Sequence, residues 1–190
     1  MKLLEQKIMA EGKVYPGDVL KVDRFLNHRL DVDFLCKLGE EFYHLYQDCG
    51  VNKILTIEAS GIGVACLTAQ FFHCPVLFAK KARTTNLSDK VYTAQAHSYT
   101  HNTDHTVMVS KDYLGAEDRV LIVDDFLAHG EALRGLISLV NQAGAELVGC
   151  AIAIEKGFQG GGDALRKEGV RIESLAVIES MTETAVTFKH

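Results

Sequence analysis

Residues 120–132 have the sequence VLIVDDFLAHGEA, and this segment gives the strongest indication of the fold. Its four apolar residues, Val120 to Val123, are typical of a strand buried on both faces of a parallel sheet. Two acids follow at the carboxyl end of that strand. We predict a loop over Asp124 to Gly130 and a helix over residues 133–140, where apolar side chains recur at helical spacing. A buried strand, an acid pair and a helix in this order indicate one βα unit of an α/β fold.

The same alternation continues on both sides of this unit. Further strands are predicted at residues 54–57, 75–79, 106–109, 147–154 and 170–177, and further helices at residues 2–10, 32–49, 64–72 and 163–167. Alternating strands and helices imply a mostly parallel sheet with helices on both faces, which binds ligands at the carboxyl ends of its strands. With 190 residues, two prolines and no linker-like stretch, the chain is expected to form a single domain over residues 1–190.

Composition narrows the possible partners and the cellular compartment. The 20 basic and 25 acidic residues give a net charge of −5, which argues against a nucleic-acid binder that relies on counterion release. No apolar run is long enough to span a membrane, and the first residues do not resemble an export signal. Five cysteines without Cys-x-x-Cys spacing predict reduced thiols. We therefore expect a cytoplasmic protein that binds neither nucleic acid nor membrane.

The acid pair and the loop after it suit one kind of ligand. A loop at a helix N-terminus presents unpaired backbone N–H groups to an anion, and the helix dipole adds to the attraction. Adjacent carboxylates can accept hydrogen bonds from a sugar diol. A phosphate and a diol at this separation describe ribose 5-phosphate. The alternative is a solvated strand end that caps the helix. The buried strand before the acids and the helix start after them favour the ligand site.

This segment resembles the signature of type I phosphoribosyltransferases, enzymes that bind phosphoribosyl pyrophosphate, and the resemblance extends over nearly the whole chain. It implies a mostly parallel central sheet flanked by helices, with a small N-terminal hood (about residues 1–30) and a flexible loop. It also implies that Asp124 and Asp125 hold the ribose hydroxyls. The 5-phosphate would be held by the loop residues Ala128, His129, Gly130, Glu131 and Ala132.

The phosphate loop departs from the commonest family pattern. In that pattern a threonine precedes the glycine, and a second glycine and then a threonine follow it. This chain has His129, Glu131 and Ala132 at those positions, so two hydroxyl donors are lost. The backbone N–H groups remain, and the His129 ring can donate. Glu131 adds a negative charge near a phosphate, which the sequence does not explain.

Three further residues point to the base. Leu20, Asn27 and Lys156 match the members of the family that use xanthine, which implies a purine-salvage transferase forming XMP. Lys156 has donors and no acceptor, so it favours a carbonyl at purine position 6 over the amine of adenine. The alternatives are a surface lysine beside Gly157, an enzyme for adenine, hypoxanthine or guanine, and a regulator that senses phosphoribosyl pyrophosphate without catalysis. The acidic charge and the short N-terminal segment argue against the regulator.

A second glycine loop follows the strand at residues 54–57. In EASGIG, residues 58–63, the family resemblance assigns Ala59, Ser60 and Gly61 to the pyrophosphate. Glycines here allow a close backbone approach to an anion. The rival is a dinucleotide-binding loop. A lone Gly-x-Gly is weak evidence for it, and no acid stands about 20 residues further on at a strand end.

Lys80, Lys81 and Arg83 follow the strand at residues 75–79 and could receive pyrophosphate oxygens, or they could begin an ordinary solvated loop. The long polar segment to His105 predicts a functional lid that carries Lys90 and Tyr99. Lys81 and Tyr99 join the acid pair as candidate catalytic groups. His97, His101 and His105 recur every four residues, but poor helix formers between them favour solvated histidines over a metal site.

The reaction that the resemblance implies needs little covalent chemistry from the protein. Ribosyl transfer passes through an oxocarbenium-like transition state, so the protein must position the base and neutralise the leaving pyrophosphate. We expect Mg²⁺ to arrive with phosphoribosyl pyrophosphate and no protein metal site. The resemblance also implies a homodimer.

Overall fold

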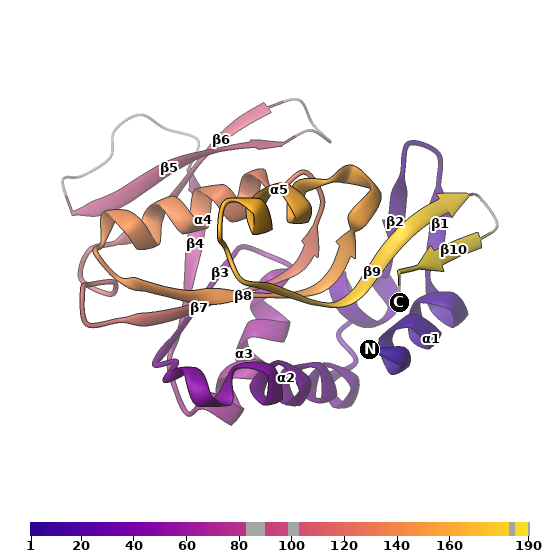
Figure 1. Ribbon diagram of the computed structural model, residues 1–190, viewed down its shortest axis with the longest axis horizontal. Coiled ribbons are helices and arrows are strands. Elements are labelled where there is room, and N and C mark those ends of the chain that lie inside the picture. Colours follow the sequence, from indigo (N-terminus) through magenta and orange to yellow (C-terminus); the bar gives the residue numbers. More distant parts are fainter. Residues whose placement is uncertain (83–89, 99–102, 183–184, 190) are drawn as a thin grey trace.

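The computed structural model describes residues 1–82, 90–98, 103–182 and 185–189. Its main element is an eight-stranded sheet with the order β10-β9-β8-β7-β3-β4-β6-β5 (Figure 1). The five central strands, from β9 to β4, run parallel, and β10, β6 and β5 are antiparallel to their neighbours. The predicted α/β class and the mostly parallel sheet are confirmed.

The elements have the following bounds. The helices are α1 (Lys2–Glu11), α2 (Val32–Tyr46), α3 (Gly61–Phe72), α4 (Glu131–Gln142) and α5 (Gly161–Lys167), with short turns at η1 (Asp23–Asn27), η2 (Gln47–Cys49) and η3 (Gly157–Gln159). The strands are β1 (Lys13–Tyr15), β2 (Val19–Lys21), β3 (Lys53–Ile57), β4 (Val76–Ala82), β5 (Val91–Ser98), β6 (Thr103–Ser110), β7 (Arg119–Leu127), β8 (Glu146–Lys156), β9 (Ile172–Thr182) and β10 (Ala185–Phe188). No helix in these ranges is long and apolar enough to cross a membrane.

Strand β7 is buried on both faces, as its apolar run predicts. Leu121 and Val123 belong to the core under α2 and α3, whereas Val120 and Ile122 belong to the core under α4. The predicted loop after Val123 is wrong, because β7 continues to Leu127. The cause is its long neighbour β8, with which β7 stays paired along almost its whole length. The two acids therefore lie within a strand, where the backbone fixes their directions.

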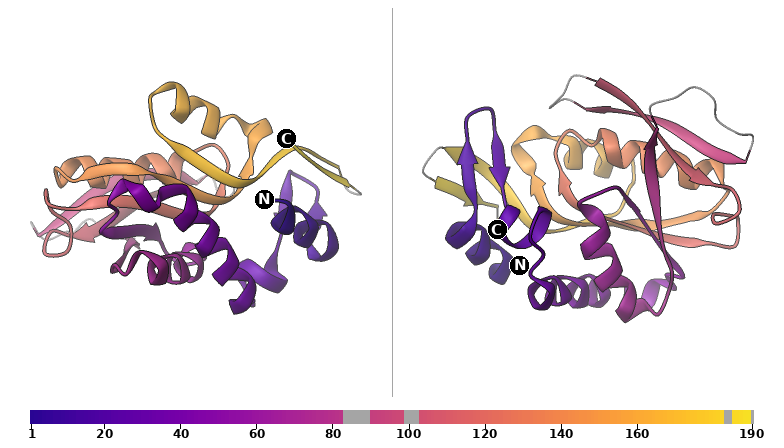
Figure 2. Two further views of the ribbon diagram at one scale, coloured as in Figure 1. Left: turned by 60° about the horizontal axis from the view of Figure 1, so that its bottom comes forward. Right: turned by 180° about the vertical axis from the view of Figure 1, so that it is seen from behind.

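The direction of the strand order changes between β3 and β7. Among the parallel strands the order is β4-β3-β7-β8-β9, so the chain leaves β3 and β7 toward opposite ends of the sheet. Helix α3, which follows β3, lies on one face, and α4, which follows β7, lies on the other (Figures 1 and 2). Open α/β sheets bind ligands at such a switch point, outside the carboxyl ends of the strands.

The N-terminal elements stand at the β10 end of the sheet. Helix α1 and the β1–β2 hairpin lie beside β9 and β10, near the C-terminus (Figures 1 and 2). Leu4 and Ile8 of α1 are fully buried, and the N-terminal amine donates to Leu175 O of β9. Strands β1 and β2 pair antiparallel, and Asp31 caps α2 by accepting a hydrogen bond from Phe34 N at 3.2 Å.

The described parts of the segment from Lys80 to His105 form strands. Strand β4 runs to Ala82, and β5 pairs with β6 along its whole length. Tyr92 and Ala94 pack against the core under α4, and Gln142 Nε2 of α4 donates to Thr93 O at 2.8 Å. The described part is thus a paired extension of the sheet that packs against α4, and the functional lid stays a prediction. Arg83, Tyr99 and His101 lie outside the described residues.

Candidate active site

The acid pair lies at the carboxyl end of β7 and is almost closed to solvent. Asp124 and Asp125 are 5% and 6% exposed, and Asp125 N donates to Asp124 Oδ1 at 3.0 Å. Burial raises the pKa of Asp124 well above its ordinary value, and the neighbouring charge of Asp125 raises it further. Lys81 acts in the opposite direction. The charged form of Asp124 is therefore unfavourable until a ligand or cation compensates it.

The glycine loop after β3 touches the acid pair directly. A Cβ placed on Gly61 would lie 2.3 Å from Thr56 Oγ1 and 2.7 Å from Asp124 Oδ1, so only glycine fits there. Just before it, Ala59 is exposed and Ser60 is half-buried. Helix α3 begins at Gly61, and its first backbone N–H groups lack intrahelical partners. The predicted pyrophosphate loop and the predicted diol site thus adjoin at the switch point.

Lys81 reaches the same place from β4. Its backbone N–H donates to Glu58 Oε1 at 2.6 Å, which ties β4 to the start of the glycine loop. Its ammonium charge lowers the pKa of Asp124, against the larger effects of burial and of Asp125, which raise it. Lys80 and Lys81 are both exposed. The charge of Lys81 therefore acts on Asp124 of the acid pair.

The loop after β7 leads directly into the N-terminus of α4. Gly130 caps α4 with φ at +91°, a left-handed conformation that favours glycine. His129 before it is exposed, and Ala132 after it is half-buried. Glu131 lies in the first turn of α4, where the helix dipole stabilises a negative charge. The hydrogen bond to Glu168 is the main cause that raises the pKa of Arg134, and the charge of Glu131 adds to it.

A second glycine supports this loop, and sequence reasoning missed it. A Cβ on Gly161, the first residue of α5, would lie 2.3 Å from Ala128 O and 2.4 Å from His129 C. Gly130 in turn faces Leu165 and Gly161. The N-terminus of α5 is therefore packed against the predicted phosphate loop. The glycine-rich stretch at residues 157–162 was the available signal, but a single sequence does not show what packs against it.

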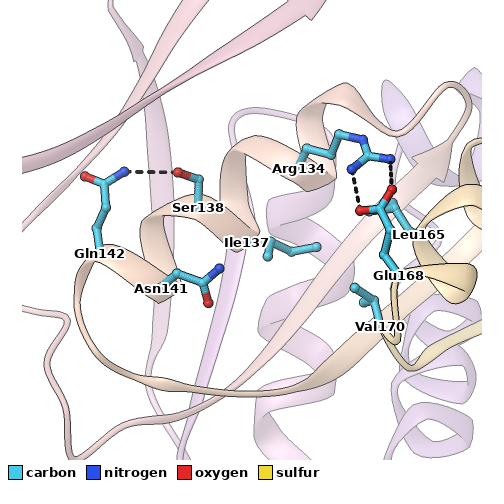
Figure 3. A pocket seen from close by; sticks show the side chains of 8 residues that line it. All are labelled: Arg134, Ile137, Ser138, Asn141, Gln142, Leu165, Glu168 and Val170. Atoms are coloured by element: carbon cyan, nitrogen blue, oxygen red, sulfur yellow. Dashed lines mark hydrogen bonds and ion pairs between the residues drawn. The ribbon is translucent and has the colours of Figure 1, made fainter.

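Two arginine–glutamate pairs hold α5 in this position. Arg166 donates to both carboxylate oxygens of Glu155 at 2.8 and 2.7 Å, and Glu155 is 1% exposed. Arg134 of α4 donates to both oxygens of Glu168 at 2.7 and 2.6 Å. The second pair closes one end of a groove of about 460 Å³ between α4 and α5, lined by Ile137 and other side chains (Figure 3).

Lys156 lies at the carboxyl end of β8, on the same edge as the acid pair. Its Nζ donates to Asp18 O in the β1–β2 turn at 2.7 Å and lies 5.8 Å from the centre of the Phe126 ring. Burial lowers the pKa of Lys156, and the charge of Asp18 partly offsets this effect. An ammonium has three donors, and Asp18 O takes one of them. The hairpin thus reaches the edge of the sheet where the site lies.

The other two predicted base residues lie in the N-terminal part. Leu20, on β2, is 6% exposed and belongs to the core under α1 and α2. Asn27 is exposed at the last position of η1. Among the described residues of the hairpin, Asp18 is the one that forms a hydrogen bond with Lys156.

The comparison with family models decides what this arrangement is. The phosphoribosyl transferase domain model matches residues 40–185. The chain belongs to this phosphoribosyltransferase family. The resemblance stated from the acid-pair motif is therefore confirmed, and the dinucleotide-binding alternative is set aside.

Relatives named xanthine phosphoribosyltransferase align with this chain over its whole length. The xanthine phosphoribosyltransferase of Clostridium novyi is 49% identical over 190 residues, and that of Bifidobacterium longum subsp. infantis is 53% identical over 193 residues. Each alignment covers 100% of both chains.

Solved structures show the same fold at lower identity. Adenine phosphoribosyltransferase from Rhodothermus marinus has a TM-score of 0.74 and 22% identity, covering 94% of this chain and 100% of that one. The adenine enzyme from Trypanosoma brucei, solved with AMP, pyrophosphate and ribose 5-phosphate, has a TM-score of 0.75 and 19% identity, covering 92% and 78%.

Proposed function

We propose that this phosphoribosyltransferase transfers the 5-phosphoribosyl group of phosphoribosyl pyrophosphate to xanthine and so serves purine salvage. The products are XMP and pyrophosphate. The observation that carries the proposal is the junction at the switch point, where the glycine loop after β3 meets Asp124 of β7 within contact distance. The full-length relatives named xanthine phosphoribosyltransferase, at about 50% identity, support xanthine as the base.

Each part of the sugar substrate has a place in this arrangement. Asp124 and Asp125 accept hydrogen bonds from the two ribose hydroxyls. The backbone N–H groups of the loop from Ala128 to Ala132 bind the 5-phosphate at the N-terminus of α4. Ala59, Ser60 and Gly61 do the same for the pyrophosphate at the N-terminus of α3, with Lys81 beside them. A phosphate, a diol and a pyrophosphate thus lie along one crevice.

The reaction breaks one bond and forms another at ribose C1. The bond from C1 to the pyrophosphate oxygen breaks, and pyrophosphate leaves with the electron pair. A ring nitrogen of the purine attacks C1 and loses its proton. Positive charge develops on the ribose ring between these events, and the adjacent carboxylates stabilise it. The chain's own residues hold the two substrates in line, and this positioning lowers the barrier to the reaction.

We assign Mg²⁺ to the substrate. When bound, Mg²⁺ neutralises the pyrophosphate charge and so makes it a better leaving group. Two adjacent buried carboxyls, of which Asp124 is only partly compensated by the charge of Lys81, suit a substrate that brings a cation with it. In the ranges that the structure describes, no three His, Cys, Asp or Glu side chains gather as a metal cluster.

The base binds between the hairpin and the end of β8 in this proposal. Lys156 donates to the 6-oxo group of xanthine with a donor that Asp18 O leaves unused. Asn27 contacts a second polar edge of the base, and Leu20 packs beside it. Residues 1–30 act as a hood over the base, and Lys156 connects that hood to the sheet.

Three expectations from the sequence extend the proposal. Tyr99, which lies outside the described residues, acts as a further catalytic group beside Lys81. The chain works as a homodimer, as the family resemblance implies, and light scattering on the purified protein checks this. The protein works in the cytoplasm, where its five cysteines stay reduced, and all five are free thiols in this structure.

The decisive experiment measures nucleotide formation. The protein is incubated with phosphoribosyl pyrophosphate, Mg²⁺ and one purine at a time, namely xanthine, hypoxanthine, guanine or adenine. We expect XMP to form with the highest kcat/KM. Absence of any nucleotide product would overturn the proposed activity, whereas a preference for adenine would overturn only the assignment of the base pocket.

A further inference from the structure

Thr56 carries a buried hydroxyl that the packing of the protein does not explain. It lies in β3 between Leu55 and Ile57, in a strand that is otherwise apolar from Ile54 onward, and it is completely buried. Its Oγ1 has no hydrogen-bond partner among the described residues. An unpaired buried hydroxyl is unfavourable, and valine would fill the same volume without that cost. Such a group in a native structure needs an explanation, and a role at a binding or catalytic site is one of them.

The position of this hydroxyl points to the partner. Thr56 Oγ1 lies 2.3 Å and Asp124 Oδ1 lies 2.7 Å from the point where a Cβ on Gly61 would stand. Both oxygens therefore face the same small space under the first residue of α3. This space lies at the switch point, between the loop proposed to bind pyrophosphate and the acid pair proposed to bind the diol.

Asp124 Oδ1 can accept one more hydrogen bond. It already accepts one from Asp125 N at 3.0 Å, and a carboxylate oxygen has two lone pairs. A hydroxyl donor favours the charged form of a carboxylate, which burial disfavours here. The same bond would fix the direction of the carboxylate.

We propose that Thr56 is a positioning residue, whose hydroxyl donates to Asp124 Oδ1 when phosphoribosyl pyrophosphate binds and so holds that carboxylate toward the ribose diol. This inference rests on the proposed function, because it assigns a role in binding the ribose. In the unliganded protein the hydroxyl stays unpaired, and the bond forms once the substrate makes the charged carboxylate favourable.

The test replaces the hydroxyl by a methyl group of the same size. Thr56→Val is expected to lower kcat/KM for phosphoribosyl pyrophosphate about tenfold, the size of one hydrogen bond to a charged group. KM for xanthine should stay within about twofold, because Thr56 is placed at the sugar. The free protein should be as stable as wild type or more so, and Thr56→Ser should restore most of the rate.

The matched control is Thr68→Val in α3. Thr68 is equally buried, but its hydroxyl donates to Val64 O at 2.8 Å. The control variant should lose some stability and keep wild-type kinetics, the reverse of what is expected for Thr56→Val.

Several results would overturn the inference while leaving the proposed function intact. One such result is wild-type kcat/KM in the Thr56→Val protein. Another is a loss of rate in Thr56→Ser as large as that in Thr56→Val. A Thr56→Val protein that melts earlier or fails to fold would also overturn it, because the hydroxyl would then have a structural partner. Failure of the wild-type protein to form any nucleotide would instead contradict the proposed function.

Discussion

Lys156 and Asp18 are joined across 138 residues of sequence, because Lys156 Nζ donates to the backbone carbonyl of Asp18 at 2.7 Å. The bond links the carboxyl end of β8 to the turn of the N-terminal hairpin. Asp18 accepts through its backbone, with φ at +58°, so the shape of the turn rather than the aspartate side chain presents the oxygen. The hairpin and the lysine therefore form one unit at the edge of the proposed base site.

Lys156→Ala should impair binding of the base far more than binding of the sugar. Removing the donor leaves the 6-oxo group unpaired at a cost of roughly 1–3 kcal/mol, or about 5- to 150-fold in affinity. KM for xanthine should rise accordingly in steady-state assays, with KM for phosphoribosyl pyrophosphate nearly unchanged. Lys37→Ala, at an exposed lysine of α2, is the control. An equal rise in both constants would contradict the assignment of Lys156 to the base.

The double variant Asp124→Asn, Asp125→Asn should fold and lose most activity. Each charge-assisted hydrogen bond to a diol hydroxyl contributes on the order of 1.5–3 kcal/mol. Losing two of them should lower kcat/KM at least about a hundredfold. Circular dichroism checks the fold and the nucleotide assay checks the rate. Activity within about threefold of wild type would rule out the ribose assignment.

Asp124→Asn alone should stabilise the unliganded protein at neutral pH. The folded-state pKa of Asp124 is raised, so its stabilising effect is present at low pH and is lost as pH rises through that pKa. Asparagine cannot ionise, so the variant avoids this loss, and a gain of about 1 kcal/mol would raise Tm about 2–4 °C.

Thermal melts at several pH values check this pH dependence. The gain should shrink as the pH falls toward about 4, near the ordinary value for aspartate. Asp112→Asn, at an exposed aspartate, is the control and should show no gain at any pH. A variant less stable than wild type at pH 7 would show that ionised Asp124 is compensated without ligand.

Local sequence patterns were enough to predict the centre of the fold. The apolar run from Val120 to Val123 indicates a strand covered on both faces, and the structure shows it between two cores. The acids that follow this run predict a ligand site, because the carboxyl ends of parallel strands share one edge.

Features that depend on long-range packing were not predicted. Strand β10, Ala185–Phe188, is short and partly exposed, and it exists because β9 offers it an edge. The strand continues through Asp124 because β8 pairs with it, which no local pattern shows. Gly61 was predicted as an anion-loop glycine, whereas its contact with Thr56 and Asp124 became visible only from the fold.

Gly161→Ala should weaken binding of phosphoribosyl pyrophosphate by disturbing the phosphate loop. The added methyl group would lie 2.3 Å from Ala128 O, so the loop or α5 must move. Small displacements of a binding loop are costly, and KM for phosphoribosyl pyrophosphate should rise about tenfold or more. Gly160→Asn is the control, since a Cβ there meets nothing within 4 Å and asparagine tolerates the left-handed backbone. An unchanged KM would show that α5 does not support the loop.

The two arginine–glutamate pairs of α5 should differ in their effect on stability. Arg166→Met leaves the buried carboxylate of Glu155 without its main partner and should cost roughly 3–5 kcal/mol of unfolding free energy. Arg134→Met breaks an exposed pair with Glu168 and should cost about 0–1 kcal/mol, so it serves as the matched control. Urea unfolding of both variants measures the difference.

The loss in Arg166→Met should depend on pH in a defined direction. Burial alone would raise the pKa of Glu155, but hydrogen bonds from Arg166 and Ser174 outweigh it and hold that pKa below its ordinary value. The stabilisation by the ionised carboxylate is therefore present above the unfolded-state pKa, about 4.3, and is lost as pH falls through the folded-state pKa. Wild type should then lose more stability than Arg166→Met on acidification. Equal acid sensitivity of the two proteins would show that Arg166 does not hold Glu155 in its charged form.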